Sequence, residues 1–448
     1  MTLHTVHARE AIDPHASATA EAEFGAPLVQ RYVRFIPLLW LAGIHILTAA
    51  SLVAYLTKRR WPKGWMINLA VLGWIGIGLT QSFSAFVNAM LMHDVLGNLH
   101  NMGAILVFGW IFGGLAIGVG YSYALATPKT VRAICVLGGM ILAFGSFCGA
   151  MRLDGAEEFS IETPASMLFS SSSLKSSTLE ALSHATFFAA ERNSEETEIR
   201  LSIFNPWAIC LGFGSIAVTM ISFLEKSFGW RVIGVAGGLI GTIFSFSRIA
   251  IASLALAIAV RLFFMAGPLI RAVLITAILV LLAGLALNGL DPLHLSDAFK
   301  DAADQYRDGS SSVREMVYEQ SWAGFWQSPV FGHGWPGESA TSEISEEGDI
   351  QLSPVGTHSS YSGLLYTGGI ITFSAFVLAY LFTFIGVLAA VLRSAHGSEA
   401  RKYAVTGLTL FIALLLFSPY QQAQSDTLSS VYYFIWLGGT IRLASTEA

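Results

Sequence analysis

Charged side chains are scarce in this chain of 448 residues: Asp, Glu, Lys and Arg make up 12% of it, whereas hydrophobic residues make up 54%. Soluble domains carry roughly 25% charged residues. Each charged side chain at the centre of a membrane helix costs about 2.5–3.5 kcal/mol to insert, so a chain that crosses a bilayer repeatedly has to be poor in charge. The shortage excludes an ordinary soluble domain and predicts an integral membrane protein, with the lipid bilayer as its main partner.

Several motifs that would indicate a function are also absent. We find no P-loop, no HExxH, no CxxC and no DxD, and no basic patch interleaved with aromatics that would favour nucleic acid as a partner. The apolar runs lack the central carboxylate that ion-coupled transporters usually keep. We therefore expect any enzymatic activity to occur at the membrane surface, without ATP, cofactor or metal.

The remaining polar candidates for metal or disulfide chemistry are few. Cys135, Cys148 and Cys210 lie inside apolar runs, and we interpret them as buried thiols rather than a disulfide framework or metal site. The acidic group Glu346, Glu347 and Asp349 could hold a cation, but a solvated loop is the favoured interpretation.

Long apolar segments recur along almost the whole sequence. A membrane helix needs about 20 apolar residues, and we place spans at 35–56, 66–87, 102–125, 131–151, 206–223, 232–246, 249–264, 273–290, 364–392, 404–417 and 428–443. The predicted fold class is all-α, a polytopic transmembrane helical bundle with about eleven spans (ten to twelve). The glycine-rich runs GGLAIGVG and GVAGGLIG should allow close helix packing.

Two long polar segments divide the spans into groups. The predicted organisation is a polar amino-terminal tail at 1–34, spans at 35–151, an outer segment at 152–205, spans at 206–290, a large outer loop at 291–357, and spans at 358–443.

The short loops predict the orientation, because cytoplasmic loops carry an excess of Lys and Arg. TKRRWPK, TPKTVR, EKSFGWR, RLFFMAGPLIR and RSAHGSEARK are basic, while NAMLMHDVLGNLHN and SPYQQAQSD are nearly free of Lys and Arg. Both long polar segments should then lie on the outer face. Arg31 and Arg34 disagree, since they flank the first span on that side. Either the amino terminus is outside, or the region contains an unrecognised re-entrant element.

Short amphipathic helices are expected in both outer segments. Ser177 and Glu180 have the spacing of a capping box before LEALSHATFF, and Ser312 and Glu315 have it within SSSVREMVYEQSWAGFW. SDAFKDAADQY should form another short helix. Ser328-Pro329 should end the helix before the glycine-rich turn PVFGHGWPG.

Three side chains at the predicted outer face could carry chemistry. Arg248 lies between two apolar runs, and Arg314 lies in the first turn of a predicted helix, where free backbone N–H groups and a guanidinium together suit a phosphate or diphosphate. His358 lies at the start of a span and could accept a proton from a hydroxyl. The alternatives without chemistry are that Arg248 reaches the lipid headgroups, that Arg314 is a solvated surface residue, and that His358 has a structural role.

Taken in order, four segments resemble the O-antigen ligase and O-antigen polymerase superfamily of bacterial inner membranes. These are RLSIFNPWA, FSFSRIAIASLALA, VREMVYEQSWAGFWQSPVFGHGWPG and VGTHSSYSGLLYTGGIITF, which together cover about residues 200–392. The family commonly has Asn after its histidine, and this chain has Ser359 there. The context around His358 looks more like exopolysaccharide polymerases than lipid A core ligases.

The resemblance implies a glycosyltransferase whose donor is an oligosaccharide linked through diphosphate to undecaprenol, with an acceptor glycan as the second substrate. By this resemblance His358 is the general base, Arg248 and Arg314 stabilise the departing diphosphate, and Arg200 holds a phosphate. Tyr361 and the tryptophans Trp322, Trp326 and Trp335 are candidates for sugar stacking, with membrane-interface anchoring as the alternative. It also implies a bacterial inner-membrane location, an active site facing the periplasm, and a flippase and chain-length regulators as partners.

Other functions remain open at this point. An O-antigen ligase that transfers glycan to lipid A core is the nearest alternative to a polymerase. A transporter or flippase is disfavoured by the missing intramembrane carboxylates and the absence of a visible internal repeat. A non-catalytic scaffold for polysaccharide assembly would leave Arg248, Arg314 and His358 without a reason to share a face.

Overall fold

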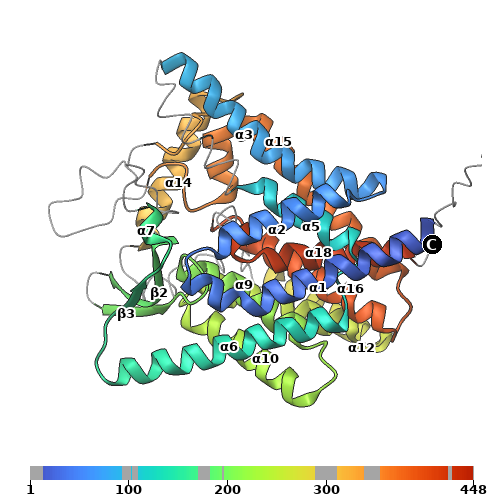
Figure 1. Cartoon of the computed structure of the whole chain (residues 1–448). Helices are drawn as coiled ribbons and strands as arrows, with labels where there is room; N and C mark the ends of the chain where they lie inside the picture. Colours follow the sequence, from blue (N-terminus) through green and yellow to red (C-terminus); the bar gives the residue numbers. More distant parts are fainter. Residues whose placement is uncertain are drawn as a thin grey trace, which may run out of the picture.

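The protein is a bundle of long helices with a small sheet at one end (Figure 1). The computed structural model describes residues 14–92, 102, 109–169, 182–193, 196–287, 310–337, 354–421 and 426–446. The helices are α1 (Pro14–Leu41), α2 (His45–Arg59), α3 (Trp65–Met92), α5 (Trp110–Ser122), α6 (Pro128–Leu153), α7 (Ser166–Phe169), α9 (Ala208–Ser222), α10 (Phe228–Phe244), α11 (Arg248–Met265), α12 (Pro268–Leu287), α14 (Ser310–Gln327), α15 (Ser360–Arg393), α16 (Glu399–Phe417), α17 (Asp426–Ser429) and α18 (Val431–Thr446). The strands are β1 (Phe159–Glu162), β2 (His184–Asn193) and β3 (Glu196–Leu201).

The helical part agrees closely with the hydropathy of the sequence. Among the described residues, five helices are long and apolar enough to cross a membrane, namely those that include 65–91, 128–153, 248–265, 360–393 and 399–417. Shorter apolar helices accompany them at 110–122, 208–222 and 228–244 and at the start of α12. The chain is thus a multi-pass, mostly helical membrane protein, and the total of about eleven spans stays a prediction.

The predicted first span, 35–56, is wrong, because the chain reverses direction inside it. α1 ends at Leu41, Gly43 adopts a left-handed φ of 74°, and the Ile44 N–H bonds the Leu39 carbonyl at 2.9 Å. This is the Schellman arrangement that ends a helix at glycine. α2 then returns, so that the Arg59 guanidinium lies 4.6 Å from the Phe24 ring centroid.

This helical hairpin explains why Arg31 and Arg34 disagreed with the orientation predicted from the loops. Both lie within α1, before the turn at Gly43, and neither marks the boundary of a span. The element missed by hydropathy was therefore a tight turn between two apolar helices. The described part of the predicted polar tail, from Pro14 on, likewise belongs to α1.

One end of the bundle, which we call the basic end, gathers the loops predicted to be cytoplasmic. Arg132 pairs with Glu225 at 2.8 Å, Lys226 pairs with Glu399 at 2.6 Å, and Arg271 contacts His396 at 3.1 Å. The Arg132 guanidinium lowers the pKa of the Glu225 carboxyl. Four of the five basic loops are therefore joined directly, as their shared sidedness predicts.

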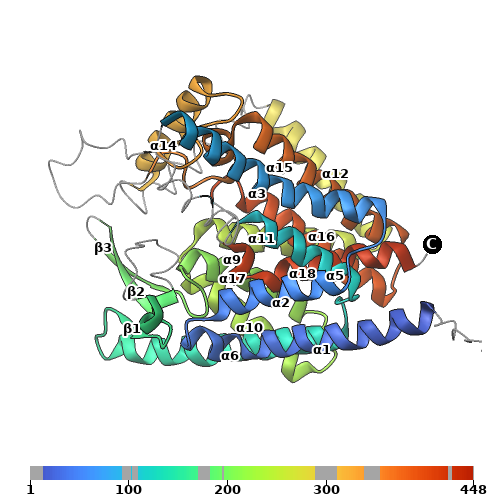
Figure 2. The same ribbon diagram turned by 45° about the horizontal axis from the view of Figure 1, so that its top comes forward.

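The opposite end, which we call the sheet end, carries β1, β2, β3 and α14 (Figures 1 and 2). Here the prediction of an all-α chain is confirmed only in part, because the chain is mostly helical but β1–β2–β3 form an antiparallel sheet. The expected helix over LEALSHATFF is a strand from His184, while Ser177, Glu180 and the helix expected at SDAFKDAADQY lie outside the described residues.

Long-range aromatic contacts explain why this segment forms strands. Phe187 of β2 and Phe204, just after β3, both pack on Trp40 of α1, with ring centroids at 4.9 and 5.4 Å. Phe144 of α6 contacts the same two rings at 5.8 and 5.2 Å. Such partners favour a strand rich in Thr and Phe, and a local capping pattern cannot reveal them.

α15 is interrupted close to the sheet end, as its glycines allow. Gly369 has φ 63° and ψ −166°, a conformation almost restricted to glycine. The break leaves backbone groups without helical partners, and the turn that follows α14 supplies them. His333 N–H bonds the Tyr366 carbonyl at 2.8 Å, Gly334 N–H bonds the Thr367 carbonyl at 2.7 Å, and Ile370 N–H bonds the Pro329 carbonyl at 2.9 Å. The predicted turn PVFGHGWPG is confirmed, and it docks α14 onto α15.

Substitution of Gly369 by alanine should destabilise the folded protein. Its φ is unfavourable for any side chain, and an added Cβ would lie 2.3 Å from the Val330 carbonyl oxygen. The strain alone is worth about 1–3 kcal/mol, so we expect a clear fall in the melting temperature of the purified protein in detergent. Gly149→Ala in α6 is the matched control, because nothing lies within 4 Å of its added Cβ. Equal melting temperatures for both variants would contradict this account of the break.

Candidate functional site

Two of the predicted arginines line one small pocket at the sheet end. Arg200, Arg248 and Gln421 form its polar wall, and the rest consists of Ile209, Phe246, Ser247 and Ile249. The cavity is about 30 Å³, which is room for one or two water-sized groups. Arg200 is 9% exposed, whereas Arg248 is exposed at the surface. A larger anionic ligand could therefore reach this pair of guanidinium groups from the side of Arg248.

The turn between α10 and α11 places Arg248 at the first position of its helix. Phe246 has a left-handed φ of 49°, and the Ser247 hydroxyl caps α11 by accepting the Ala250 N–H at 3.3 Å. A helix amino terminus carries a partial positive charge, so an anion is favoured there and a cation is not. Placing a guanidinium at this point makes the site strongly electropositive and suited to phosphate.

The sheet brings Arg200 to the same place from a distant part of the sequence. Arg200 pairs with Ala189 near the end of β3, and the chain then turns through Phe204, whose φ is 64°, into α9. Asn205 stabilises this turn, since its amide group donates to the Ile203 carbonyl at 3.1 Å. The Asn-Pro element of RLSIFNPWA thus forms the corner between sheet and membrane helix.

His358 lies at the start of α15 in an unusual backbone conformation. Its φ is 62°, a left-handed value that costs a residue other than glycine about 1–3 kcal/mol. The next residue, Ser359, is the helix cap, because its hydroxyl accepts the N–H groups of Tyr361 and Ser362 at 3.1 and 3.3 Å. Ser and Asn are both favourable capping residues, so the serine at this position suits the start of α15.

A hydrogen-bonded link joins the His358 segment to the arginine pocket. The Gln421 carbonyl accepts the Ser360 hydroxyl at 2.8 Å and the Ser360 N–H at 3.1 Å. The same N–H lies 2.8 Å from the Ser418 carbonyl. Because Gln421 is also a wall of the pocket, the histidine and the two arginines belong to one connected region of the sheet end.

α14 holds the His358 loop from the other side. The Tyr318 hydroxyl donates to the His358 carbonyl at 3.3 Å, and the Ser321 hydroxyl accepts the Gly356 N–H at 2.9 Å. Arg314 lies in this helix, one turn before Tyr318. Its side chain is not among the parts of the chain that the structure describes. The backbone arrangement therefore brings the segment carrying Arg314 next to the His358 loop.

Tyr361 lines an apolar groove between α15 and α16. Its ring packs edge-on against Phe376 at 5.3 Å, and it is not among the residues that line the arginine pocket. Trp322 and Trp326 are 51% and 63% exposed on α14 and contact one another at 5.7 Å. Both sugar stacking and membrane-interface anchoring remain consistent with their positions. The acidic group around Glu346 lies outside the described residues.

Sequence reasoning missed the residues that connect the site. Gln421 belongs to SPYQQAQSD, which was used only to assign orientation, and Tyr318 and Ser321 are three residues apart on α14. Three of the four described non-glycine residues with positive φ, Phe204, Phe246 and His358, adjoin candidate residues. Strain of this kind gathers at functional sites, and it is not visible in the sequence. Cys135, Cys148 and Cys210 are buried thiols that form no disulfide, as predicted.

Comparison with known proteins identifies the central part of the chain. No curated protein matches it. A family model described as O-antigen ligase matches residues 233–377, which include α11, α14, the turn after α14, His358 and the start of α15. Members of that family are glycosyltransferase-like membrane enzymes. The match covers about a third of the chain, and it confirms the resemblance to the O-antigen ligase and polymerase superfamily that the motifs indicated.

Proposed function

We propose that this protein is an inner-membrane glycosyltransferase that joins saccharides carried on a lipid diphosphate, at the periplasmic face. The observation that carries the proposal is the shared pocket of Arg200 and Arg248, at the amino terminus of α11, tied through Gln421 to the His358 segment. The proposal assigns diphosphate binding to this pocket and the general base to His358, both at the end opposite the basic loops.

The proposed reaction needs two tasks from the protein. An acceptor sugar hydroxyl attacks the anomeric carbon of the donor, the carbon–oxygen bond to the diphosphate breaks, and the lipid diphosphate leaves. His358 takes the hydroxyl proton, while Arg248, with Arg200 and Arg314, stabilises the charge that develops on the diphosphate. The donor is already activated, so neither ATP nor a redox cofactor enters the balance.

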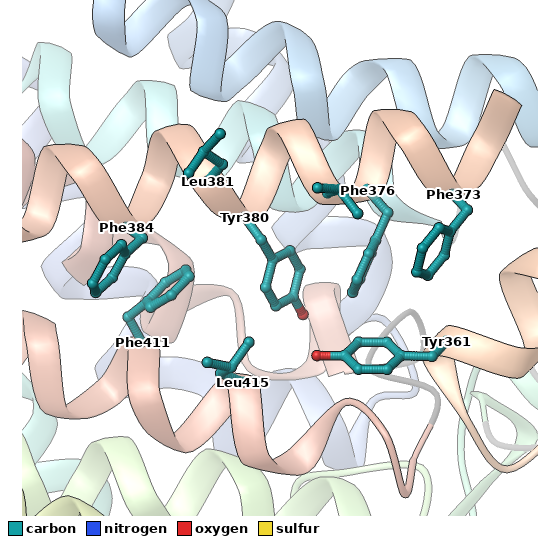
Figure 3. A pocket seen from close by; sticks show the side chains of 9 residues that line it. Tyr361, Phe373, Phe376, Tyr380, Leu381, Phe384, Phe411 and Leu415 are labelled. Carbon is teal, nitrogen blue, oxygen red and sulfur yellow. The ribbon is translucent and has the colours of Figure 1, made fainter. Parts of the chain in front are cut away.

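An apolar groove beside the His358 segment supports a lipid-linked donor (Figure 3). It encloses about 390 Å³ between α15 and α16 and is lined by Tyr361, Phe373, Phe376, Val377, Tyr380, Leu381, Phe384, Phe411 and Leu415. Tyr361, three residues after His358, lies at one end, and the groove continues along α15 to Phe384. From Phe373 to Phe384 the helix rises about 16 Å. Such a groove would hold part of a polyprenyl chain such as undecaprenol.

Among the reactions of this superfamily we propose chain polymerisation, with the acceptor glycan itself carried on lipid diphosphate. The support is the HSSY sequence and the LLYTGG that follows it, which resemble exopolysaccharide polymerases. A flippase would deliver the donor to the periplasmic leaflet, and chain-length regulators would act on the product. Transfer to lipid A core is the alternative reaction at the same site.

Reconstitution tests this proposal directly. The full chain is placed in proteoliposomes with undecaprenyl-diphosphate oligosaccharide and a metal chelator, and products are separated by gel electrophoresis and mass spectrometry. We expect longer lipid-linked chains. A parallel reaction adds lipid A core as acceptor, and glycan transfer to it without lengthening of the lipid-linked chain would indicate a ligase instead. If protein with an intact cooperative melting transition forms neither product, the glycosyltransferase proposal is wrong.

A further inference from the structure

A second cluster of cationic groups lies at the basic end, far from the proposed site. Arg271 is in the first turn of α12, and Arg401 is in the first turn of α16. His396, in the link between α15 and α16, contacts the Arg271 guanidinium at 3.1 Å. Arg401 reaches the same link, since one of its terminal nitrogens lies 3.3 Å from the Ser394 carbonyl oxygen. Two guanidinium groups are therefore bonded to one short link.

The described carboxylates near this cluster bind other cations. Glu399 pairs with Lys226, and Glu225 pairs with Arg132. Arg401 is 8% exposed, and one of its terminal nitrogens donates to the Val391 and Ser394 carbonyls at the end of α15. Those bonds occupy one of the two terminal nitrogens of the Arg401 guanidinium. The Nε atoms of Arg401 and Arg271 are buried and have no hydrogen-bond partner among the described residues.

The position of Arg271 adds a further reason to expect an anion. A cation in the first turn of a helix opposes the helix dipole, whereas an anion there is stabilised by it. Each guanidinium can offer two parallel N–H groups, a geometry that matches phosphate oxygens. Leu269, Ile270 and Val273 on the same turns of α12 are 77%, 57% and 60% exposed, so an apolar surface adjoins the cluster.

We infer that Arg271, Arg401 and His396 form a binding site for a phosphate group at the basic end. The exposed apolar residues of α12 favour the headgroup of an anionic phospholipid as its source, since acyl chains would cover them. Free phosphate has the same chemistry and is the second source to test. Occupancy would neutralise the paired guanidinium groups and stabilise the junction of α12 with the link between α15 and α16.

Thermal unfolding of the full chain in nanodiscs distinguishes the sources. The three conditions are phosphatidylcholine alone, phosphatidylcholine with inorganic phosphate, and phosphatidylcholine mixed with phosphatidylglycerol. Arg271→Gln is the test variant, because the described side-chain hydrogen bond of Arg271 is to His396. Arg231→Gln is the matched control, since Arg231 lies in the first turn of another helix of the basic end, α10, 5.9 Å from the Phe228 ring centroid.

We expect phosphatidylglycerol to raise the melting temperature of the wild type and of Arg231→Gln by a few degrees, and that of Arg271→Gln by much less. In phosphatidylcholine alone Arg271→Gln should melt no lower than the wild type, which shows that the variant folds. The same pattern with inorganic phosphate would assign the site to free phosphate. An equal rise in both variants, or no rise in the wild type with either anion, would overturn the inference.

Discussion

His358→Asn should lower the rate of glycan transfer by roughly 10²–10⁴, the usual contribution of a general base. Asparagine removes the imidazole but tolerates a left-handed backbone better than most residues. Because His358 has a φ of 62°, this variant separates the loss of the base from the strain that another side chain would add. The measurement is the initial rate of product formation in proteoliposomes, beside the melting temperature of the same preparation.

The adjacent Thr357 provides the control for this experiment. Its hydroxyl donates to the Pro354 carbonyl at 2.6 Å and is exposed, so Thr357→Ala alters the same loop without touching the imidazole. We expect it to keep most of the activity. If His358→Asn also keeps near wild-type rates, His358 is a structural residue and the base must be sought elsewhere.

Arg248→Gln should reduce the maximal rate by about 10²–10³, which corresponds to a loss of about 2.7–4 kcal/mol of transition-state stabilisation. Negative charge on the diphosphate increases as the glycosidic bond breaks, so the turnover number should fall more than the affinity for the donor changes. Steady-state rates at several donor concentrations separate these two effects. Arg248 lies at the exposed side of its pocket, and its replacement should leave the fold intact.

Arg152→Gln is the matched arginine control for this measurement. Arg152 also lies at the sheet end, in the last turn of α6, but it lines a separate pocket with Cys148 and Phe188. Its loss should change the turnover number little. Similar losses for the two arginines would mean that general charge at this face matters, and a specific diphosphate site at Arg248 would not be supported.

The helices could be located from the sequence with few errors. Spans such as 66–87 and 131–151 lie inside α3 and α6, and the basic loops meet at one end as their composition predicts. The errors occurred where local and distant interactions compete. At Gly43 a helix-ending turn lies within a continuous apolar stretch, and at β2 aromatic partners on α1 and α6 stabilise a strand.

Only part of the candidate site could be predicted from the sequence. The order of the motifs indicated Arg200, Arg248 and His358, yet no spacing could show that Arg200 and Arg248 line one pocket or that Gln421 connects them to the His358 segment. Tyr361, a candidate for sugar stacking or membrane-interface anchoring, lines the groove between α15 and α16, which the sequence did not indicate. The glycine-rich turn after α14 was predicted only as a turn, and its hydrogen bonds to the break in α15 were not foreseen.

What the sequence by itself determined is the division between lipid and water: which segments are helices in the bilayer, which loops share a side, and which family the motifs resemble. The first two follow from the composition of continuous segments, because lipid requires every segment it surrounds to satisfy its own backbone. The third follows from the order of four short motifs. Only the tertiary structure decided which side chains meet. Arg200 on β3 and Arg248 at the start of α11 are 48 residues apart (248 − 200). Their approach depends on the sheet, the aromatic cluster and the reversal at Gly43 acting together, and such cooperation among distant contacts leaves no local trace in the chain.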